Sequence, residues 1–402
     1  MCRAPVLPLF ARQLGAGPEL VGLVAGASTL TGVLLKLPAG AISDAIGRRA
    51  VLLGAASVFA LMPLTYPFAT AVAMLIMLRF VHGSATALFG PTASAALSDI
   101  APPGDRGQWL GTYSAIQGSG QAAGPVIAGV ILERAGFSTT FFSAAAFGAT
   151  AWILIAWWQG GPSISLGTGL STSLGTGPRP RSTINWRDVR VAVASVARDA
   201  RIVLTSVAQA GQFVLHGMIT AFLPIYAVER VGLRPSEAGL LFGAQMLTTI
   251  LARPVFGRLS DRAGRRPMIV AGLSTCAIAV ALFAWSTGFV GLLALSALYG
   301  TGLAITTSST AALITDLADR PVPSKPRDGS GRRVEGSRYG AAHGLFGTIF
   351  DVGDALGPIA GGLVAGRFGY HTLFYGSAAL ALCLALIFGI GSRRWSGETT
   401  RG

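Results

Sequence analysis

Two carboxylates lie close together in a long apolar stretch of the second half of the chain. Asp351 and Asp354 are three residues apart, so in a helix they share one face. A helix predicted over residues 339–366 places them near the middle of a membrane. Desolvation and mutual repulsion would favour the protonated form of at least one, which suits reversible proton binding or capture of a cation. The alternative is a structural ion pair with Lys36 at a helix interface.

A guanidinium lies in another apolar stretch, at Arg79, and His82 follows one turn later. A charged side chain inside a membrane helix costs about 2.5–3.5 kcal/mol on insertion scales, so Arg79 is expected to face a water-filled cavity or an acidic partner. Other polar side chains recur at helical spacing and are interpreted as cavity lining, although each alone is equally consistent with packing: Gln117, Gln121, Gln209, Gln212 and His216.

A short charged pattern occurs twice, as GAISDAIGRR at 40–49 and GRLSDRAGRR at 257–266. Its small residues allow two helices to approach closely, its glycine turns the chain, and its Asp and two Arg can form charge pairs that one conformation makes and another breaks. The residues that carry the pattern are Gly40, Asp44, Gly47, Arg48 and Arg49, and then Gly257, Asp261, Gly264, Arg265 and Arg266.

The two copies belong to a repeat of the whole half-chain. The offset between them, 217 in residue number, also places Lys36 on Arg253 and Asp99 on Asp316. A glycine pattern repeats at an offset of 233, and its members are Gly111, Gly120, Gly124, Pro125 and Gly129, matched by Gly344, Gly353, Gly357, Pro358 and Gly362. The larger offset predicts an insertion within 321–338 whose length equals the difference between the two offsets. Two related halves of one design follow.

The elements that position these residues are membrane-spanning helices. The chain of 402 residues is 51% hydrophobic and 12% charged, with a mean hydropathy of +0.59. Its apolar runs are continuous and near the length that crosses a bilayer. Helices are predicted over 20–42, 50–68, 71–98, 107–132, 138–159, 201–227, 236–257, 267–287, 289–315, 339–366 and 370–391. The bundles are 1–159 and 201–391, joined by a Gly/Ser/Thr-rich linker at 160–200 and followed by a tail at 392–402.

The net charge of +14 resides mainly in alternate loops. This distribution indicates that these loops, the linker and the C-terminal tail are cytoplasmic, and it argues against nucleic acid as a partner. We expect a multi-pass protein of the plasma (inner) membrane that acts as a monomer, with the lipid bilayer, protons and a small molecule as its partners.

The repeat also bears on the first helix. The segment PVLPLFARQLG near Met1 aligns with residues around Pro224, so the counterpart of residues 201–216 would precede Met1. We therefore expect most of a first helix to be missing from this chain, because the polypeptide begins upstream or is a truncated form.

These motifs resemble those of the major facilitator superfamily, in particular its drug/proton antiporter branch with twelve helices. The charged pattern is similar to the G-x-x-x-D-x-x-G-R-R segment between helices 2 and 3 and between 8 and 9. Arg79, His82 and Gly83 are similar to the helix 4 signature R-x-x-[QH]-G, and Gly111 to Gly129 to the helix 5 motif, except for Ala128. The resemblance implies an all-α fold of two pseudo-symmetric six-helix bundles. It also implies that the charged pattern locks one conformation and that Arg79 is linked to proton movement or substrate charge.

No enzyme, metal or cofactor motif such as H-E-x-x-H or a phosphate-binding loop is present in the sequence. The resemblance implies secondary active transport, and we expect proton-coupled efflux of small drug-like or cationic compounds by alternating access. Two alternatives remain: export of sugars or other small metabolites, and a non-transporting sensor form.

Overall fold

The computed structural model describes residues 4–102, 104–158, 197–318, 336–393 and 395. Most of the predicted linker, most of the predicted insertion and most of the tail lie outside the described residues. Only the backbone is described for 336–341 and for five positions between 37 and 44, which include Gly40 and Asp44.

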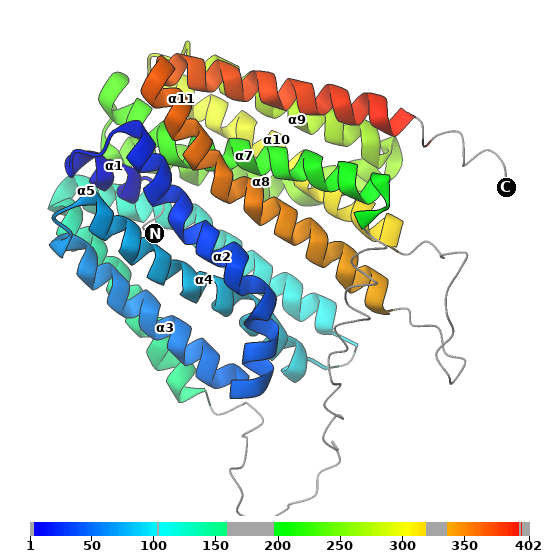
Figure 1. Cartoon of the computed structure of the whole chain (residues 1–402), viewed down its shortest axis with the longest axis horizontal. Coiled ribbons are helices and arrows are strands. Elements are labelled where there is room, and N and C mark those ends of the chain that lie inside the picture. Colours follow the sequence, from blue (N-terminus) through cyan, green and yellow to red (C-terminus); the bar gives the residue numbers. More distant parts are fainter. Residues whose placement is uncertain (1–3, 103, 159–196, 319–335, 394, 396–402) are drawn as a thin grey trace, which may run out of the picture.

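The first half begins with the short helix α1 (Val6–Gln13). It continues with α2 (Pro18–Ile46), α3 (Arg48–Thr65), the 3-10 turn η1 (Tyr66–Phe68), α4 (Val72–Ile100) and α5 (Arg106–Trp157). The second half consists of α7 (Ala200–Ile225), the π-helical turn η2 (Tyr226–Arg230), α8 (Pro235–Ala263), α9 (Arg265–Phe283), α10 (Phe289–Ala318) and α11 (Gly336–Arg393). The two halves lie side by side, coloured blue to teal and green to red (Figure 1).

The backbone reproduces both offsets of the repeat at glycines with positive φ. Gly47 and Gly264 have φ of 98° and 93°, Gly15 and Gly232 have φ of 81° and 79°, and both pairs are related by the offset of 217. Gly136 and Gly369, related by the offset of 233, have φ of 77° and 81°. The last pair kinks α5 and α11, so each contains two antiparallel helices, as the sequence predicted.

The charged pattern is mostly helical, whereas the sequence predicted a loop between two helices. Residues up to Ile46 belong to α2, and residues up to Ala263 belong to α8. The chain reverses only at Gly47 and Gly264, whose left-handed conformations other residues rarely adopt. Asp261 therefore projects from a helix end rather than from a flexible connection.

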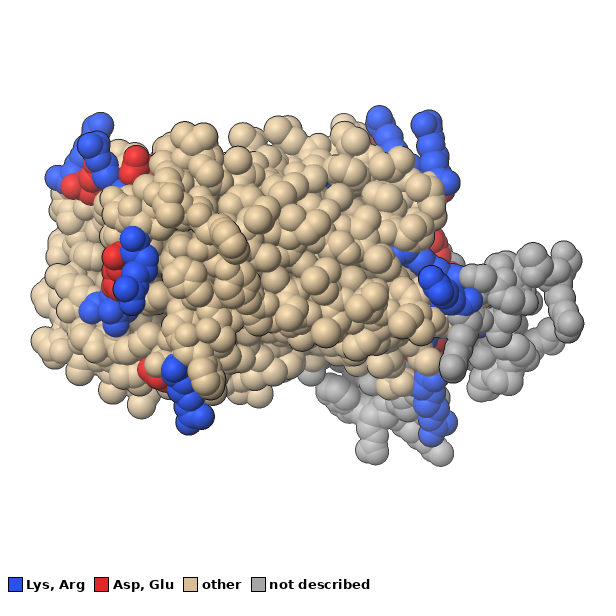
Figure 2. Space-filling view, turned by 90° about the horizontal axis from the view of Figure 1, so that it is seen from above, with Lys and Arg blue, Asp and Glu red and all other residues tan. Residues whose placement is uncertain are grey.

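Nine described helices are long and apolar enough to cross a membrane, and two of them are the kinked double helices. Charged side chains gather at the two ends of the molecule and leave a broad uncharged band between them (Figure 2). Leu247, Leu251 and Val255 of α8 are 51–63% exposed on that band. This arrangement is that of a multi-pass membrane protein, whose apolar surface is covered by lipid.

The halves meet along two helix pairs, α2 with α11 and α5 with α8. Because these pairs are antiparallel, one end of the molecule carries the reversals at Gly47 and Gly264, and the opposite end carries the kinks at Gly136 and Gly369. We call these the loop end and the kink end. Helix α7 is the most enclosed candidate span, with 61% of its apolar window buried.

Candidate functional site

An ion pair joins the two halves at the kink end. The Nε and Nη2 atoms of Arg12 donate to the two carboxylate oxygens of Glu229 at 2.8 and 3.1 Å. Arg12 lies in the last turn of α1 and Glu229 lies in η2, and their residue numbers differ by 217. They are therefore equivalent positions of the repeat, and the pseudo-twofold axis of the molecule passes between them.

A second polar contact closes the kink end between α5 and α8. Glu133 accepts a hydrogen bond from the backbone N–H of Ser236 at 3.3 Å and lies 3.9 Å from Arg234. Ser236 is in the first turn of α8, where backbone N–H groups favour a carboxylate. Sequence reasoning missed the four residues that form these contacts, Arg12, Glu133, Glu229 and Arg234, because each lies near the end or kink of a helix and outside any motif.

Close helix packing accompanies these contacts. A Cβ atom added at Gly129 would collide with the backbone of Pro235, and one at Gly362 with the backbone of Pro18. Other small positions of the two glycine motifs pack similarly: Gly124 is buried, Pro125 contacts Gly239, Gly353 contacts Ala210, Gly357 contacts Val214, and Pro358 contacts Gly22.

The same motifs are open toward the loop end. A Cβ atom added at Gly111, Gly120 or Gly344 would have no heavy atom within 4 Å. Most residues in the loop-end part of α5 are exposed, and so are most residues of 251–263 in α8. The two halves therefore touch at the kink end and separate toward the loop end.

The first cavity, of about 650 Å³, lies between α2, α3, α4, the second part of α5 and α11. Lys36 Nζ lies 2.7 Å from Asp351 Oδ2, so one of the predicted carboxylates pairs with Lys36 across the two halves. Lys36 also lies over the ring of Phe350, 5.6 Å from its centroid. Asp354 Oδ2 accepts from the hydroxyl of Thr29 at 3.4 Å and is 6% exposed. The ion pair with Lys36, which the sequence offered as a structural alternative for Asp351, is therefore present in the structure.

Arg79 and His82 of α4 also line this cavity. Arg79 is 4% exposed, and its Nε atom has no hydrogen-bond partner among the described residues. His82 Nδ1 lies 3.0 Å from the hydroxyl of Tyr66, and the two rings stack. His82 is therefore held against the end of α3.

The repeat relates the first cavity to the surroundings of α7. At an offset of 217, Phe59 and His82 of the cavity wall correspond to Cys276 and Tyr299. In the second half, Cys276 Sγ accepts from Gln212 of α7 at 3.7 Å. The first cavity thus occupies the position that α7 fills in the other half.

The second cavity, of about 310 Å³, lies on the interface between α5, α7 and α8, and Ala4, just before α1, also lines it. Gln121 and His216 line it together with Phe242 and Met246. His216 Nδ1 lies 3.4 Å from Gln245 Nε2. Gln117 lies one turn from Gln121 toward the loop end and is exposed. The structure thus brings together the predicted polar residues of α5 and one of the three from α7.

Gln209 and Gln212 lie elsewhere, in the core of the second half. Gln209 Oε1 accepts from the hydroxyl of Thr310, and Gln212 Nε2 lies 3.5 Å from the carbonyl of Gly302. They are 4% and 0% exposed. Their spacing suggested the same face as His216, but α9 and α10 cover that part of α7.

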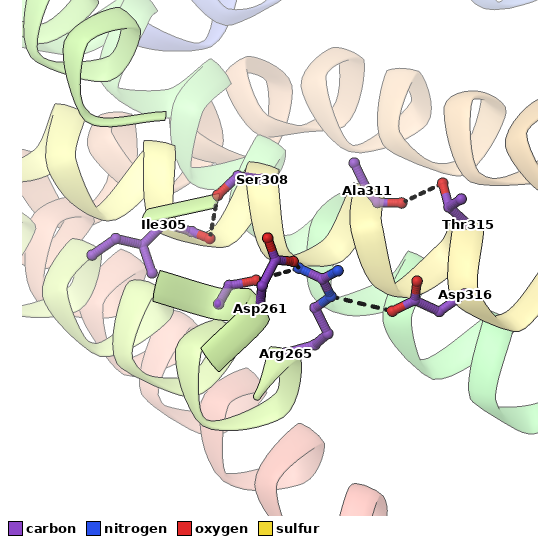
Figure 3. A network of polar contacts seen from close by, with 8 residues as sticks. Asp261, Arg265, Ile305, Ser308, Ala311, Thr315 and Asp316 are labelled. Carbon is purple, nitrogen blue, oxygen red and sulfur yellow. Dashed lines mark hydrogen bonds and ion pairs between the residues drawn. The ribbon is translucent and has the colours of Figure 1, made fainter. Parts of the chain in front are cut away.

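The charged pattern forms the same network in both halves. Arg48 pairs with Asp99 and donates to Ser43 at 3.3 Å. Arg265 pairs with Asp261, lies 3.2 Å from Asp316 and donates to Ser260 at 2.9 Å (Figure 3). The next arginines anchor the last helix of each half, Arg49 on the carbonyl of Ala156 at 2.6 Å and Arg266 on that of Ser392 at 3.0 Å. Each of these contacts lies within one half.

These features define a polytopic helical membrane protein in which two repeat-related halves enclose polar cavities at their interface. A family model described as Major Facilitator Superfamily matches residues 2–321 and 205–394 of this chain. The chain therefore belongs to the Major Facilitator Superfamily, and it is a transporter-family protein rather than an enzyme.

Several relatives resemble the chain over nearly its whole length. It is 22% identical over 385 residues to an uncharacterized MFS-type transporter of Methanocaldococcus jannaschii, covering 96% of this chain and 92% of that protein. It is 26% identical over 400 residues to the multi-drug resistance efflux pump PmrA of Streptococcus pneumoniae, covering 95% and 88%. It is 25% identical over 393 residues to the multidrug resistance protein MdtG of Proteus mirabilis, covering 94% and 88%.

A solved structure shares the fold. The crystal structure of a bacterial homolog to the human lysosomal transporter Spinster, in an inward-facing and unoccupied conformation, superposes with a TM-score of 0.76. The sequences are 15% identical, and the match covers 96% of this chain and 92% of that one.

Proposed function

We propose that this protein exports small amphipathic, drug-like compounds by alternating access, driven by a proton gradient. The observation that supports this proposal is the asymmetry of one interface. Gly129 and Gly362 pack tightly at the kink end, whereas Gly111 and Gly344 of the same motifs stand open at the loop end. A motif of small residues that is packed at one end only suits halves that rock and close the other end in a second state.

The loop end is proposed to be cytoplasmic, in the plasma (inner) membrane. Its reversals carry Arg48, Arg49, Arg265 and Arg266, which fits the enrichment of basic residues in cytoplasmic loops. The opening between the halves then faces the cytoplasm, where an exporter takes up its substrate. The names of PmrA and MdtG as multidrug proteins, and the resemblance of the α5 motif to that of antiporters, support export.

Proton coupling is proposed to act through Asp351 and Asp354. Protonation of Asp351 would neutralise the carboxylate that Lys36 binds across the halves. It would therefore weaken a contact between α2 and α11 and change the balance between the two states. Arg79, buried in the same cavity, supplies the positive charge that such a site needs nearby.

A compound-susceptibility screen tests the proposed function. Cells that lack their own drug pumps would express the wild type, Asp351→Asn, Arg79→Ala and the control Cys383→Ser, whose side chain is exposed outside both cavities. Wild type and control are expected to raise tolerance to a subset of amphipathic compounds, and the two site variants to lose it. Unchanged tolerance to every compound in wild-type cells, with the protein present in the membrane, would overturn the efflux proposal.

A further inference from the structure

We propose that Arg253 binds a negatively charged group of the substrate, so that the transported compounds are amphipathic organic anions such as aromatic carboxylates. This inference rests on the proposed function and narrows its substrate class. It takes the exported compound to be an acid rather than a cation.

The first observation is an excess of positive charge within the apolar band. Five described charged residues lie at least seven residues from any helix end or kink: Lys36, Arg79, Arg253, Asp351 and Asp354. Three are cations and two are carboxylates. Lys36 and Asp351 form an ion pair, whereas no ion pair of Arg253 occurs in the part of the chain that the structure describes. Charges at this depth persist where they are paired or functional.

The repeat explains why Arg253 lacks the partner that Lys36 has. Lys36 and Arg253 are equivalent at an offset of 217, on α2 and α8. The equivalent of Asp351 at an offset of 233 is Gly118 on α5, which faces Ile250 of α8. One interface between the halves therefore has an acid and a base, and the other has the base alone.

Helical phase places Arg253 on the face of α8 that continues the second cavity. Phe242 and Met246 line that cavity, and Arg253 follows Met246 by seven residues, two turns further toward the loop end. Leu251, which is 63% exposed to the lipid side, is about 200° away around the helix. Arg253 is itself exposed, and because it lies on the face of α8 opposite Leu251 we infer that it projects toward the opening between α5 and α8.

Arg253 lies too deep in the apolar band for its side chain to reach the membrane surface, which excludes the simplest alternative to substrate binding. Arg253 lies ten residues, or about 15 Å, before the end of α8 at Ala263. An arginine side chain is too short to span that distance. Its planar guanidinium instead matches a carboxylate in two parallel hydrogen bonds.

The second cavity, which begins two turns of α8 (about 10 Å) from Arg253, fits the remainder of such a compound. The volume of about 310 Å³ is at the lower end for small-molecule sites and accommodates a bicyclic aromatic body. Phe242 and Met246 supply apolar contacts, and Gln121 and His216 supply polar ones. The described lining contains no carboxylate that would repel an anion.

Binding of a matched series of probes tests the proposal. The full chain, in nanodiscs of neutral lipid, would be titrated by calorimetry with 2-naphthoate, 2-naphthamide and 2-naphthylmethylammonium. We expect the wild type to bind naphthoate at least tenfold more tightly than the other two. Arg253→Gln should lose this preference and bind the amide unchanged, which shows that the variant is folded. Arg253→Lys should retain part of it, and Arg258→Gln, at an exposed position near the end of α8, should retain all of it.

Equal binding of the three probes by the wild type, or tighter binding of the ammonium compound, would overturn the inference. So would an unchanged preference in Arg253→Gln. A third contrary result is that anionic lipid in the nanodiscs abolishes naphthoate binding to the wild type, because the guanidinium would then serve a lipid phosphate. Equilibrium binding does not require transport, so the absence of flux in a separate assay would count against the proposed function alone.

Discussion

Arg12 and Glu229 are equivalent residues of the two halves, 217 positions apart, and they form a two-hydrogen-bond ion pair with each other. A contact between equivalent residues lies on the symmetry axis that relates the halves. The pair is therefore broken by any motion that separates the halves at the kink end. It joins the Glu133 contacts with Ser236 and Arg234 as the polar closure of that end.

Removing this closure should open the kink end. In the variant Arg12→Ala with Glu133→Ala, spin labels at Gln13→Cys and Arg230→Cys are expected to show a larger population of long distances. Both pairs are partly exposed, so their loss should shift the population only about fivefold. Pulsed electron paramagnetic resonance measures the distances, in a background without the native cysteines. The charge exchange Arg12→Glu with Glu229→Arg, in a chain that keeps Glu133, should retain the short distance between the labels. A long distance in this variant would contradict the pairing.

The ion pair of Lys36 and Asp351 should contribute modestly to stability. Lys36 is 43% exposed and Asp351 is 14% exposed, so solvent weakens their attraction. A double-mutant cycle with Lys36→Met and Asp351→Asn is expected to give a coupling energy on the order of 1 kcal/mol in thermal unfolding. A coupling energy near zero would mean that the contact contributes nothing to this conformation.

The glycine motifs should divide into two classes by substitution. Gly357→Leu places a side chain against the backbone of Val214 and should lower the unfolding temperature by several degrees. Gly344→Leu meets open space in this conformation and should leave that temperature nearly unchanged. If the loop end closes during transport, Gly344→Leu should nevertheless abolish drug tolerance. Full tolerance in cells carrying this variant would argue against close approach at the loop end.

The arginine at each chain reversal should act through its acidic partner on α4 or α10. Asp316→Asn removes one of the acceptors of Arg265, and Asp99→Asn removes the corresponding partner of Arg48. Because the networks are equivalent, both variants should reduce transport to a similar degree, and the double exchange Arg265→Asp with Asp316→Arg should restore part of it. Tolerance assays with quantified membrane expression measure the effect. A loss of transport in only one of the two variants would show that the two networks have different roles.

Much of the fold followed from the sequence because its signals are local or repeated. The kinks at Gly136 and Gly369 and the reversals at Gly47 and Gly264 need glycine, and their spacing carries the repeat. The resemblance of the motifs supplied the fold, and the family match confirms it. The burial of Gln209 and Gln212 did not follow, because α7 is enclosed on several sides and its polar stripe does not reveal which neighbour covers it.

Contacts between the halves were the hardest to foresee. Lys36 and Asp351 are 315 residues apart, and only the expense of charge in a membrane suggested that they pair. The pair at the kink end had one usable signal, opposite charges at equivalent positions of the repeat. Arg253 had the converse signal: its equivalent Lys36 has a carboxylate partner, and the position equivalent to that carboxylate is Gly118.

Alternating access requires that the two ends of one interface move in opposite senses, and paired distance measurements test this most directly. Labels at Gln13→Cys and Arg230→Cys report the kink end, and labels at Gln108→Cys and Arg262→Cys, on α5 and α8, report the loop end. In the variant Arg12→Ala with Glu133→Ala, the first distance is expected to lengthen and the second to shorten in the same fraction of molecules. A kink end that opens while the loop-end distance stays unchanged would contradict the account.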